Sequence, residues 1–143
     1  IDFENAVWTI PADRMKAGVD HRIPLGSRAM ALLTSMTSNR NPDKYVFSGW
    51  KRNTGLSNNA MLALLRKMKR SDITPHGFRS TFRDWAAEEA HQFSNETIEL
   101  ALAHTIKNKA EAAYRRGDQL ERRRELMDEW EKYIYSRGMI KLK

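Results

Sequence analysis

Five polar residues of the sequence carry side chains that could act together on a phosphodiester bond. They are Lys16, His76, Arg79, His104 and Tyr114. A guanidinium and an imidazole can donate hydrogen bonds to the oxygens of one phosphate, a lysine ammonium can protonate a leaving oxygen, and a tyrosine hydroxyl can attack phosphorus. Each residue alone also has an ordinary structural explanation, so the indication of chemistry comes from their combination and their order.

The pair His76 and Arg79 is predicted to lie in the first turn of a helix. Thr74 offers a capping hydroxyl, and Pro75 suits the first helical position. Side chains three residues apart can project from one turn, where unpaired backbone N–H groups also favour an anion. This turn could therefore present an imidazole and a guanidinium to one phosphate, although an isolated His-x-x-Arg is usually a satisfied histidine near a surface arginine.

Lys16 and His104 occupy places where a structural role is the usual interpretation. Lys16 lies in a basic stretch between two predicted strands, so it is either a solvated lysine or an ammonium that a loop carries into a groove. His104 follows the apolar residues 100–103, where a histidine is more often a core or capping residue than a catalyst.

Tyr114 differs from the other tyrosines in its setting. Two arginines, Arg115 and Arg116, follow it directly, and polar segments flank the short helix predicted over residues 109–114. A residue that is presented to DNA needs such surroundings. The remaining tyrosines are interpreted as packing residues: Tyr45, Tyr133 and Tyr135.

The elements that would position these residues are mainly helical, with one small antiparallel sheet. Residues 6–10 and the apolar alternation of Ile23 and Leu25 predict a β-hairpin, whose long basic connection contains Lys16. The predicted helices cover approximately residues 29–36, 57–68, 75–85, 94–102, 109–114 and 119–135.

Local signals predict where several of these helices begin and which side they bury. Ser57 and Ser94 are the expected N-caps of the helices that follow them. Phe78, Phe82 and Trp85 are expected to form one apolar face. The last helix carries basic residues around an apolar stripe, so it should pack on its own domain or dock onto a neighbour; packing on its own domain is the ordinary expectation.

Length and charge describe one basic domain. The 143 residues suffice to bury a single core. Lys and Arg number 25 against 18 for Asp and Glu, which gives a net charge of +7 and a sequence pI near 9.9. This balance favours a polyanionic partner, most often nucleic acid, although charge alone fits a basic protein that is merely soluble equally well.

The absence of cysteine excludes disulfides, thiolate metal sites and a cysteine nucleophile. No apolar run approaches the roughly 20 residues that span a bilayer, and the N-terminus lacks the layout of a signal peptide. We therefore expect a cytoplasmic location and no membrane partner. The chain opens at Ile1, close to an expected strand, which suggests a piece of a longer protein.

The order of a hairpin lysine, a His-x-x-Arg, a Leu-x-His and a tyrosine ten residues later resembles the tyrosine recombinases, particularly the integrases of prophages and genomic islands. The local sequences that carry this resemblance are Trp8-Thr9-Ile10-Pro11 before Met15-Lys16, Thr74-Pro75-His76-Gly77-Phe78-Arg79, Leu102-Ala103-His104, and Ala113-Tyr114. The resemblance covers nearly the whole chain. Four elements in the right order and spacing make it specific.

The resemblance implies the catalytic-domain fold of these enzymes and site-specific recombination of DNA. Tyr114 would attack the scissile phosphate and form a 3′-phosphotyrosine, so that rejoining needs no ATP. Lys16 would protonate the leaving 5′ oxygen, and His76 would assist proton transfer. Arg79 and His104 would donate hydrogen bonds to the non-bridging oxygens. No cofactor or metal is implied.

The resemblance also implies double-stranded DNA as the partner and self-association on it, as a tetramer in the recombination complex. Residues 1–143 would be a C-terminal catalytic domain that is incomplete on its N-terminal side. The family uses a first arginine in a Gly-x-Arg setting upstream of the hairpin. Gly26-Ser27-Arg28 has these letters but follows the hairpin, so we do not assign it this role and expect an impaired fragment.

Two other functions fit parts of the pattern. A type IB topoisomerase resembles the recombinases in fold and active site but relaxes supercoils instead of exchanging strands. A DNA-binding module without catalysis would hold DNA through phosphate contacts alone.

Overall fold

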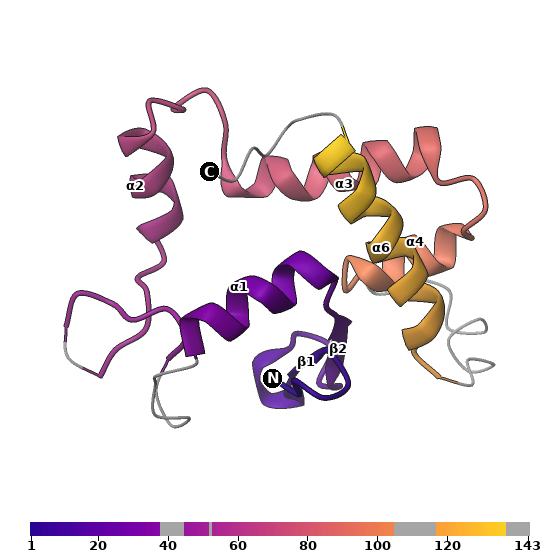
Figure 1. Cartoon of the computed structure of the whole chain (residues 1–143), viewed down its shortest axis with the longest axis horizontal. Coiled ribbons are helices and arrows are strands. Elements are labelled where there is room, and N and C mark those ends of the chain that lie inside the picture. The colour runs from indigo at the N-terminus through magenta and orange to yellow at the C-terminus, as the bar shows by residue number, and fades with distance from the viewer. Residues whose placement is uncertain (38–44, 52, 105–116, 137–143) are drawn as a thin grey trace. The chain divides into compact units, whose positions relative to one another are not determined.

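The computed structural model describes residues 1–37, 45–51, 53–104 and 117–136. These residues form a mainly helical chain with one two-stranded antiparallel sheet (Figure 1), which confirms the predicted fold class. The elements are β1 (Val7–Ile10), β2 (His21–Pro24), α1 (Ser27–Thr37), α2 (Ala60–Lys67), α3 (Pro75–Glu89), α4 (Asn95–Ala101) and α6 (Leu120–Ser136). The helix predicted over residues 109–114 lies outside the described residues.

The chain divides into two compact units. The first consists of Ile1–Met30 and Arg83–Lys143, and the second consists of Ala31–Phe82. The hairpin, α4 and α6 belong to the first unit, and α2 belongs to the second. No helix in the described part of the chain is long and apolar enough to cross a membrane.

The predicted hairpin and its long connection are confirmed. β1 and β2 pair in a register that places Thr9 opposite Arg22. The connection starts with a short 3-10 turn, where the Ala12 N–H donates to the Asp20 carboxylate over 2.8 Å. Gly18 has a φ of +63°, a conformation that glycine adopts at little cost. The connection that carries Lys16 is therefore tied at its base by Asp20.

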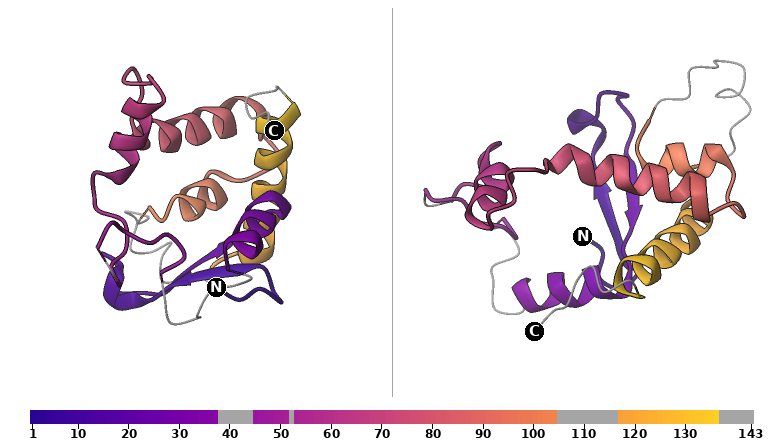
Figure 2. Two further views of the ribbon diagram at one scale, coloured as in Figure 1. Left: turned by 60° about the vertical axis from the view of Figure 1, so that its left-hand side comes forward. Right: turned by 90° about the horizontal axis from the view of Figure 1, so that it is seen from above.

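α6 packs within its own unit against both β2 and α4, as Figures 1 and 2 show. Leu126 is completely buried. Trp130 and Tyr133 pack around Trp85 of α3, with ring centroids 5.0 and 5.8 Å from that of Trp85. Such pairs contribute about 0.5–1.5 kcal/mol each beyond the area they bury. The last helix was expected to pack on its own domain, and this expectation is confirmed. Tyr133 is a packing residue, as predicted.

Two predicted helix starts are confirmed by their capping hydrogen bonds. The Ser94 hydroxyl accepts from the Thr97 N–H at the start of α4, over 3.2 Å. The Thr74 hydroxyl accepts from the Gly77 N–H at the start of α3, also over 3.2 Å. Both helices begin where the sequence places a short hydroxyl side chain.

Two details of the second unit correct the sequence prediction. The N-cap of α2 is Asn59 rather than Ser57, because the Ser57 carbonyl accepts from the Ala60 N–H in a turn that precedes the helix. Phe78 was expected on a buried face of α3 but is 57% exposed, whereas Phe82 is only 7% exposed. The covered face of α3 begins one turn later than its apolar residues suggest.

Candidate active site

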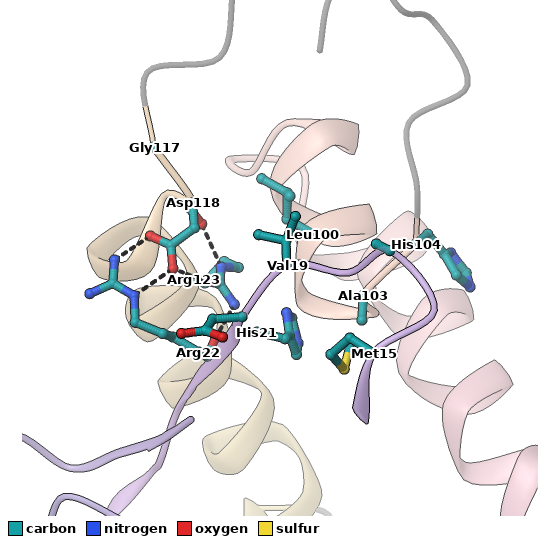
Figure 3. A pocket seen from close by; sticks show the side chains of 12 residues that line it. Met15, Val19, His21, Arg22, Leu100, Ala103, His104, Gly117, Asp118 and Arg123 are labelled. Atoms are coloured by element: carbon teal, nitrogen blue, oxygen red, sulfur yellow. Dashed lines mark hydrogen bonds and ion pairs between the residues drawn. The ribbon is translucent and has the colours of Figure 1, made fainter. Parts of the chain in front are cut away.

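A cavity of about 540 Å³ lies in the first unit, where three segments distant in sequence meet (Figure 3). The hairpin connection and β2 form one part of its wall, the end of α4 a second and the start of α6 a third. The lining residues include Met15, Ala17, His104, Gly117 and Asp118. The cavity thus gathers segments that contain or flank three of the predicted site residues.

Lys16 and His104 belong to two of these segments. The Lys16 side chain is exposed, while Met15 and Ala17 on either side of it line the cavity. His104 lines the cavity itself. Tyr114 lies outside the described residues, but the described residues that flank it in the sequence, His104 and Gly117, both line the cavity.

The end of α4 positions His104 through a Schellman motif. The His104 N–H donates to the Glu99 carbonyl over 3.0 Å, and the Ala103 N–H donates to the Leu100 carbonyl over 3.0 Å. Ala103 takes the left-handed φ of 52° that this motif requires, at a cost of about 1 kcal/mol for a residue with a Cβ. The motif turns the chain out of the helix directly at His104.

Glu99 also holds the side chain of His104. The two groups lie 2.5 Å apart, from Nδ1 to Oε2, and the other carboxylate oxygen accepts from Nε of Arg83 over 2.9 Å. Burial would raise the pKa of the Glu99 carboxyl, but the hydrogen bonds and charges of His104 and Arg83 outweigh burial and lower this pKa. An ionised carboxylate only accepts hydrogen bonds, so Nδ1 is the donor.

Arg123 is a buried cation in the cavity wall, only 1% exposed. Its guanidinium donates to the Asp118 carbonyl over 2.7 Å, to the Arg22 carbonyl over 2.5 Å and to the Asp118 carboxylate over 2.9 Å. Arg22 binds the same carboxylate with two hydrogen bonds of 2.8 and 2.6 Å, and Figure 3 shows the three side chains together. This network ties β2 to the start of α6.

The charges of this network shift one another's pKa values. Burial lowers the pKa of the Arg123 guanidinium, and the negative charge of Asp118 opposes that effect. Burial would raise the pKa of Asp118, but Arg22 and Arg123 outweigh it and lower this pKa. Asp118 is therefore ionised at neutral pH and balances the buried cation.

Sequence reasoning missed Glu99, Asp118 and Arg123. It counted Arg123 only among the basic residues around the apolar stripe of the last helix, whereas the guanidinium is enclosed by Asp118 and two backbone carbonyls. One signal was available: Arg123 stands three residues after Leu120 and four before Met127, and so falls on the apolar stripe. Nothing in the spacing of Glu99 singles it out.

His76 and Arg79 lie in the first turn of α3, as predicted, and belong to the second unit. The His76 side chain is exposed and that of Arg79 is half-buried. We expected both to converge with His104 on one concavity. Because His104 belongs to the first unit, that convergence stays a prediction.

Gly26-Ser27-Arg28, which has the letters of the family's first arginine motif, forms the start of α1. The Glu131 carboxylate accepts from the backbone N–H groups of Ser27 and Arg28 over 3.0 and 2.6 Å, and a Cβ on Gly26 would meet that carboxylate at 2.9 Å. The Arg28 guanidinium stacks over the Tyr135 ring at 4.8 Å. These contacts give the three residues a structural role.

Chemically, the cavity offers cations and hydrogen-bond donors. His104 and the two arginines Arg22 and Arg123 line it, and the chain beside it carries the Lys16 ammonium. The Asp118 carboxylate in the same wall binds both arginines and balances Arg123, so the groups that could stabilise added negative charge are His104 and Lys16. Within the four described ranges, no three histidine, aspartate or glutamate side chains gather as metal ligands would.

Comparison with known proteins extends the resemblance seen in the sequence. A family model described as "Phage integrase family" matches residues 1–121. The chain is 37% identical over 132 residues to prophage integrase IntA of Escherichia coli K12, and 30% identical over 137 residues to the integrase of Shigella phage Sf6. It is 31% identical over 150 aligned residues to the integrase of Enterobacteria phage P4. No solved structure matches the chain.

The alignments cover most of this chain but a minor part of each relative. They include 91% of the chain and 32% of IntA, 94% of the chain and 35% of the Sf6 integrase, and 93% of the chain and 34% of the P4 integrase. The chain therefore spans about a third of the length of these relatives.

Proposed function

Because the chain belongs to the phage integrase family, we propose that it is the C-terminal catalytic part of an integrase that cuts and rejoins DNA through Tyr114. The tyrosine hydroxyl attacks the scissile phosphorus, and the bond from phosphorus to the 5′ oxygen breaks. The products are a 3′-phosphotyrosine and a free 5′-hydroxyl. A 5′-hydroxyl of another strand reverses the step, so the number of phosphodiester bonds is conserved without ATP.

The other site residues support this exchange. Lys16 protonates the leaving 5′ oxygen, and His76 assists the transfer of the tyrosine proton. Arg79 and His104 donate hydrogen bonds to the non-bridging oxygens as charge builds up on them. These roles correspond to the family pattern at the same positions of this sequence.

The observation that carries the proposal is the shared cavity of the first unit. The residues on either side of Lys16, His104 itself, and the described residues that flank Tyr114 in the sequence all line it. An exposed lysine beside this cavity and a histidine in its wall that a carboxylate holds support a phosphate site. An isolated capping histidine would need neither the lysine nor the cavity.

The partner is double-stranded DNA, bound by an assembly that is a tetramer in the recombination complex. The net charge of +7 supports a polyanionic partner.

Trapping on a nicked suicide substrate tests the nucleophile. On such DNA the 5′ product diffuses away, so the covalent adduct accumulates and migrates slowly in a denaturing gel. In the complete integrase that carries these residues, Tyr114→Phe should abolish the adduct and leave DNA affinity nearly unchanged, because the phenolic oxygen serves bond exchange far more than binding.

Tyr133→Phe is the matched control, since this tyrosine packs against Trp85. Adducts that persist in Tyr114→Phe would overturn the assignment. Salt-sensitive DNA binding without any adduct would favour the non-catalytic module. Relaxation of supercoiled plasmid without exchange between two DNA sites would favour the topoisomerase.

A further inference from the structure

We propose that Glu99 is a positioning residue: its carboxylate fixes the His104 ring through Nδ1 and leaves Nε2 for a phosphate oxygen of the substrate. This inference rests on the proposed function and deepens it. Glu99 is not part of the resemblance that identified the other site residues. Its role follows from the contacts around the end of α4.

The carboxylate of Glu99 is held from two sides. One oxygen lies 2.5 Å from Nδ1 of His104, and the other accepts from Nε of Arg83 over 2.9 Å. Arg83 is itself fixed by a hydrogen bond of 2.8 Å to the Asn95 side chain. The Glu99 side chain is 23% exposed, against 45% for His104. A well-anchored acceptor therefore orients a more exposed ring.

The backbone of Glu99 performs a separate task. Its carbonyl accepts from the His104 N–H and closes the Schellman motif, which any residue at this position could do. The carboxylate adds only the contact with the ring and with Arg83. Glu99→Gln therefore leaves the helix end intact while it removes the charge, which allows the two roles to be separated.

The consequence for His104 concerns its two ring nitrogens. The contact with an ionised carboxylate places a proton on Nδ1. When the ring carries both protons, Nε2 is the donor that remains for a phosphate oxygen. Without Glu99 the ring can rotate and offer either nitrogen, so fewer molecules present the donor in the required direction.

Nitrogen NMR of the histidine rings tests the positioning directly on this chain. At alkaline pH, where histidine rings are neutral, His104 should carry its proton on Nδ1. In Glu99→Ala its spectrum should change towards the Nε2–H form that unconstrained histidines prefer. His91, which is exposed on the loop after α3, is the internal control and should not change.

A wild-type His104 that carries its proton on Nε2 would overturn the proposal, as would a His104 spectrum that is the same in Glu99→Ala. Glu99→Gln covers the case in which Glu99→Ala fails to fold. Its neutral amide can still accept one hydrogen bond, so its His104 signals should lie between those of the wild type and those of Glu99→Ala.

DNA cleavage supplies the second test, in the complete integrase. Glu99→Ala should lower the single-turnover rate of adduct formation by about 10²-fold, as misplacement of a reacting group by roughly 1 Å does. In the double variant Glu99→Ala/His104→Ala the rate should equal that of His104→Ala alone, because Glu99 acts only through the ring. Glu125→Ala is the matched control, because this carboxylate pairs with Arg122 on the surface of α6.

The two tests separate failure of this inference from failure of the proposed function. If His104→Ala cleaves at the wild-type rate, the assigned role of His104 is wrong, while the NMR result still decides whether Glu99 orients the ring. If His104→Ala is slow and the effects of the two substitutions multiply in the double variant, Glu99 acts independently and the positioning role is wrong.

Discussion

Arg123 is almost completely buried, and Asp118 supplies the charge that balances it. Two backbone carbonyls accept the remaining hydrogen bonds of the guanidinium. Taking an arginine out of water is costly, and the cost is offset only when each donor has a partner. The pair therefore adds little net stability of its own, but loss of Asp118 leaves Arg123 buried without a compensating charge.

Asp118→Asn should lower the free energy of unfolding by about 3 kcal/mol, because it leaves the Arg123 charge buried and unbalanced. Urea unfolding followed by circular dichroism measures this difference. The control is Asp72→Asn, since Asp72 pairs with Arg70 on the surface and its loss should leave the midpoint unchanged. A midpoint for Asp118→Asn equal to that of the control would show that backbone carbonyls suffice to hold Arg123.

Lys16 can be tested by changing the leaving atom. Lys16→Ala should slow cleavage of ordinary DNA by about 10²–10⁴-fold, the usual contribution of a general acid. The defect should disappear on DNA with sulfur in place of the 5′ bridging oxygen, because a thiolate leaves without a proton. Comparison of adduct formation on the two substrates gives the result. An equal defect on both would assign Lys16 to binding instead of proton transfer.

At the scale of the elements, α4 ends in a conformation that its sequence does not favour. Ala103 has a φ of 52°, and its side chain is exposed. Glycine adopts this conformation without the steric cost of a Cβ. The Schellman motif therefore imposes the left-handed conformation on residue 103, although alanine does not favour it.

Ala103→Gly should raise the free energy of unfolding by about 1 kcal/mol, because it removes the Cβ clash of the left-handed conformation. Ala101→Gly, two residues earlier and still within α4, should lower it by about 1 kcal/mol. Thermal unfolding of both variants checks the opposite signs. Destabilisation by both changes would mean that Ala103 is not left-handed in solution.

The sequence predicts the elements whose signals are local. The caps at Thr74 and Ser94 lie within three residues of the groups they bind, and so could be recognised. The burial of Arg123 depends on Asp118 and on β2. Because β2 lies about a hundred residues away along the chain, no local pattern reveals this burial. The same reason explains why Glu99 was missed, since its role depends on Arg83 of another helix.

At the scale of the whole molecule, Glu99 and Asp118 are among the described carboxyl groups that couple stability to pH. The pKa values of Glu99 and Asp118 are lowered in the folded state from ordinary values of 4.5 and 3.8. A lowered pKa contributes stability that is complete above the ordinary value and is lost as pH falls through the folded value. Both carboxylates therefore stabilise the fold at neutral pH.

Stability should accordingly be constant from neutral pH down to about pH 5 and then fall as the two carboxyls are protonated. The double variant Glu99→Gln/Asp118→Asn should be less stable than the wild type at pH 7. Its stability should also fall less than that of the wild type when the pH is lowered. Melting temperatures across this range measure both effects. Parallel curves for wild type and variant would show that other carboxyls control the acid response.

The intrinsic fluorescence of the tryptophans can report on the two units of the chain. Trp85 in the first unit is 5% exposed and packs against Trp130 and Tyr133, whereas Trp50 in the second is fully exposed. Emission from Trp85 should therefore be blue-shifted and shielded from acrylamide, and emission from Trp50 red-shifted and readily quenched. Trp8 of the first unit is 45% exposed and should also emit at longer wavelength, so fluorescence at two wavelengths can follow the two units separately in a Trp8→Phe variant, including during titration with DNA.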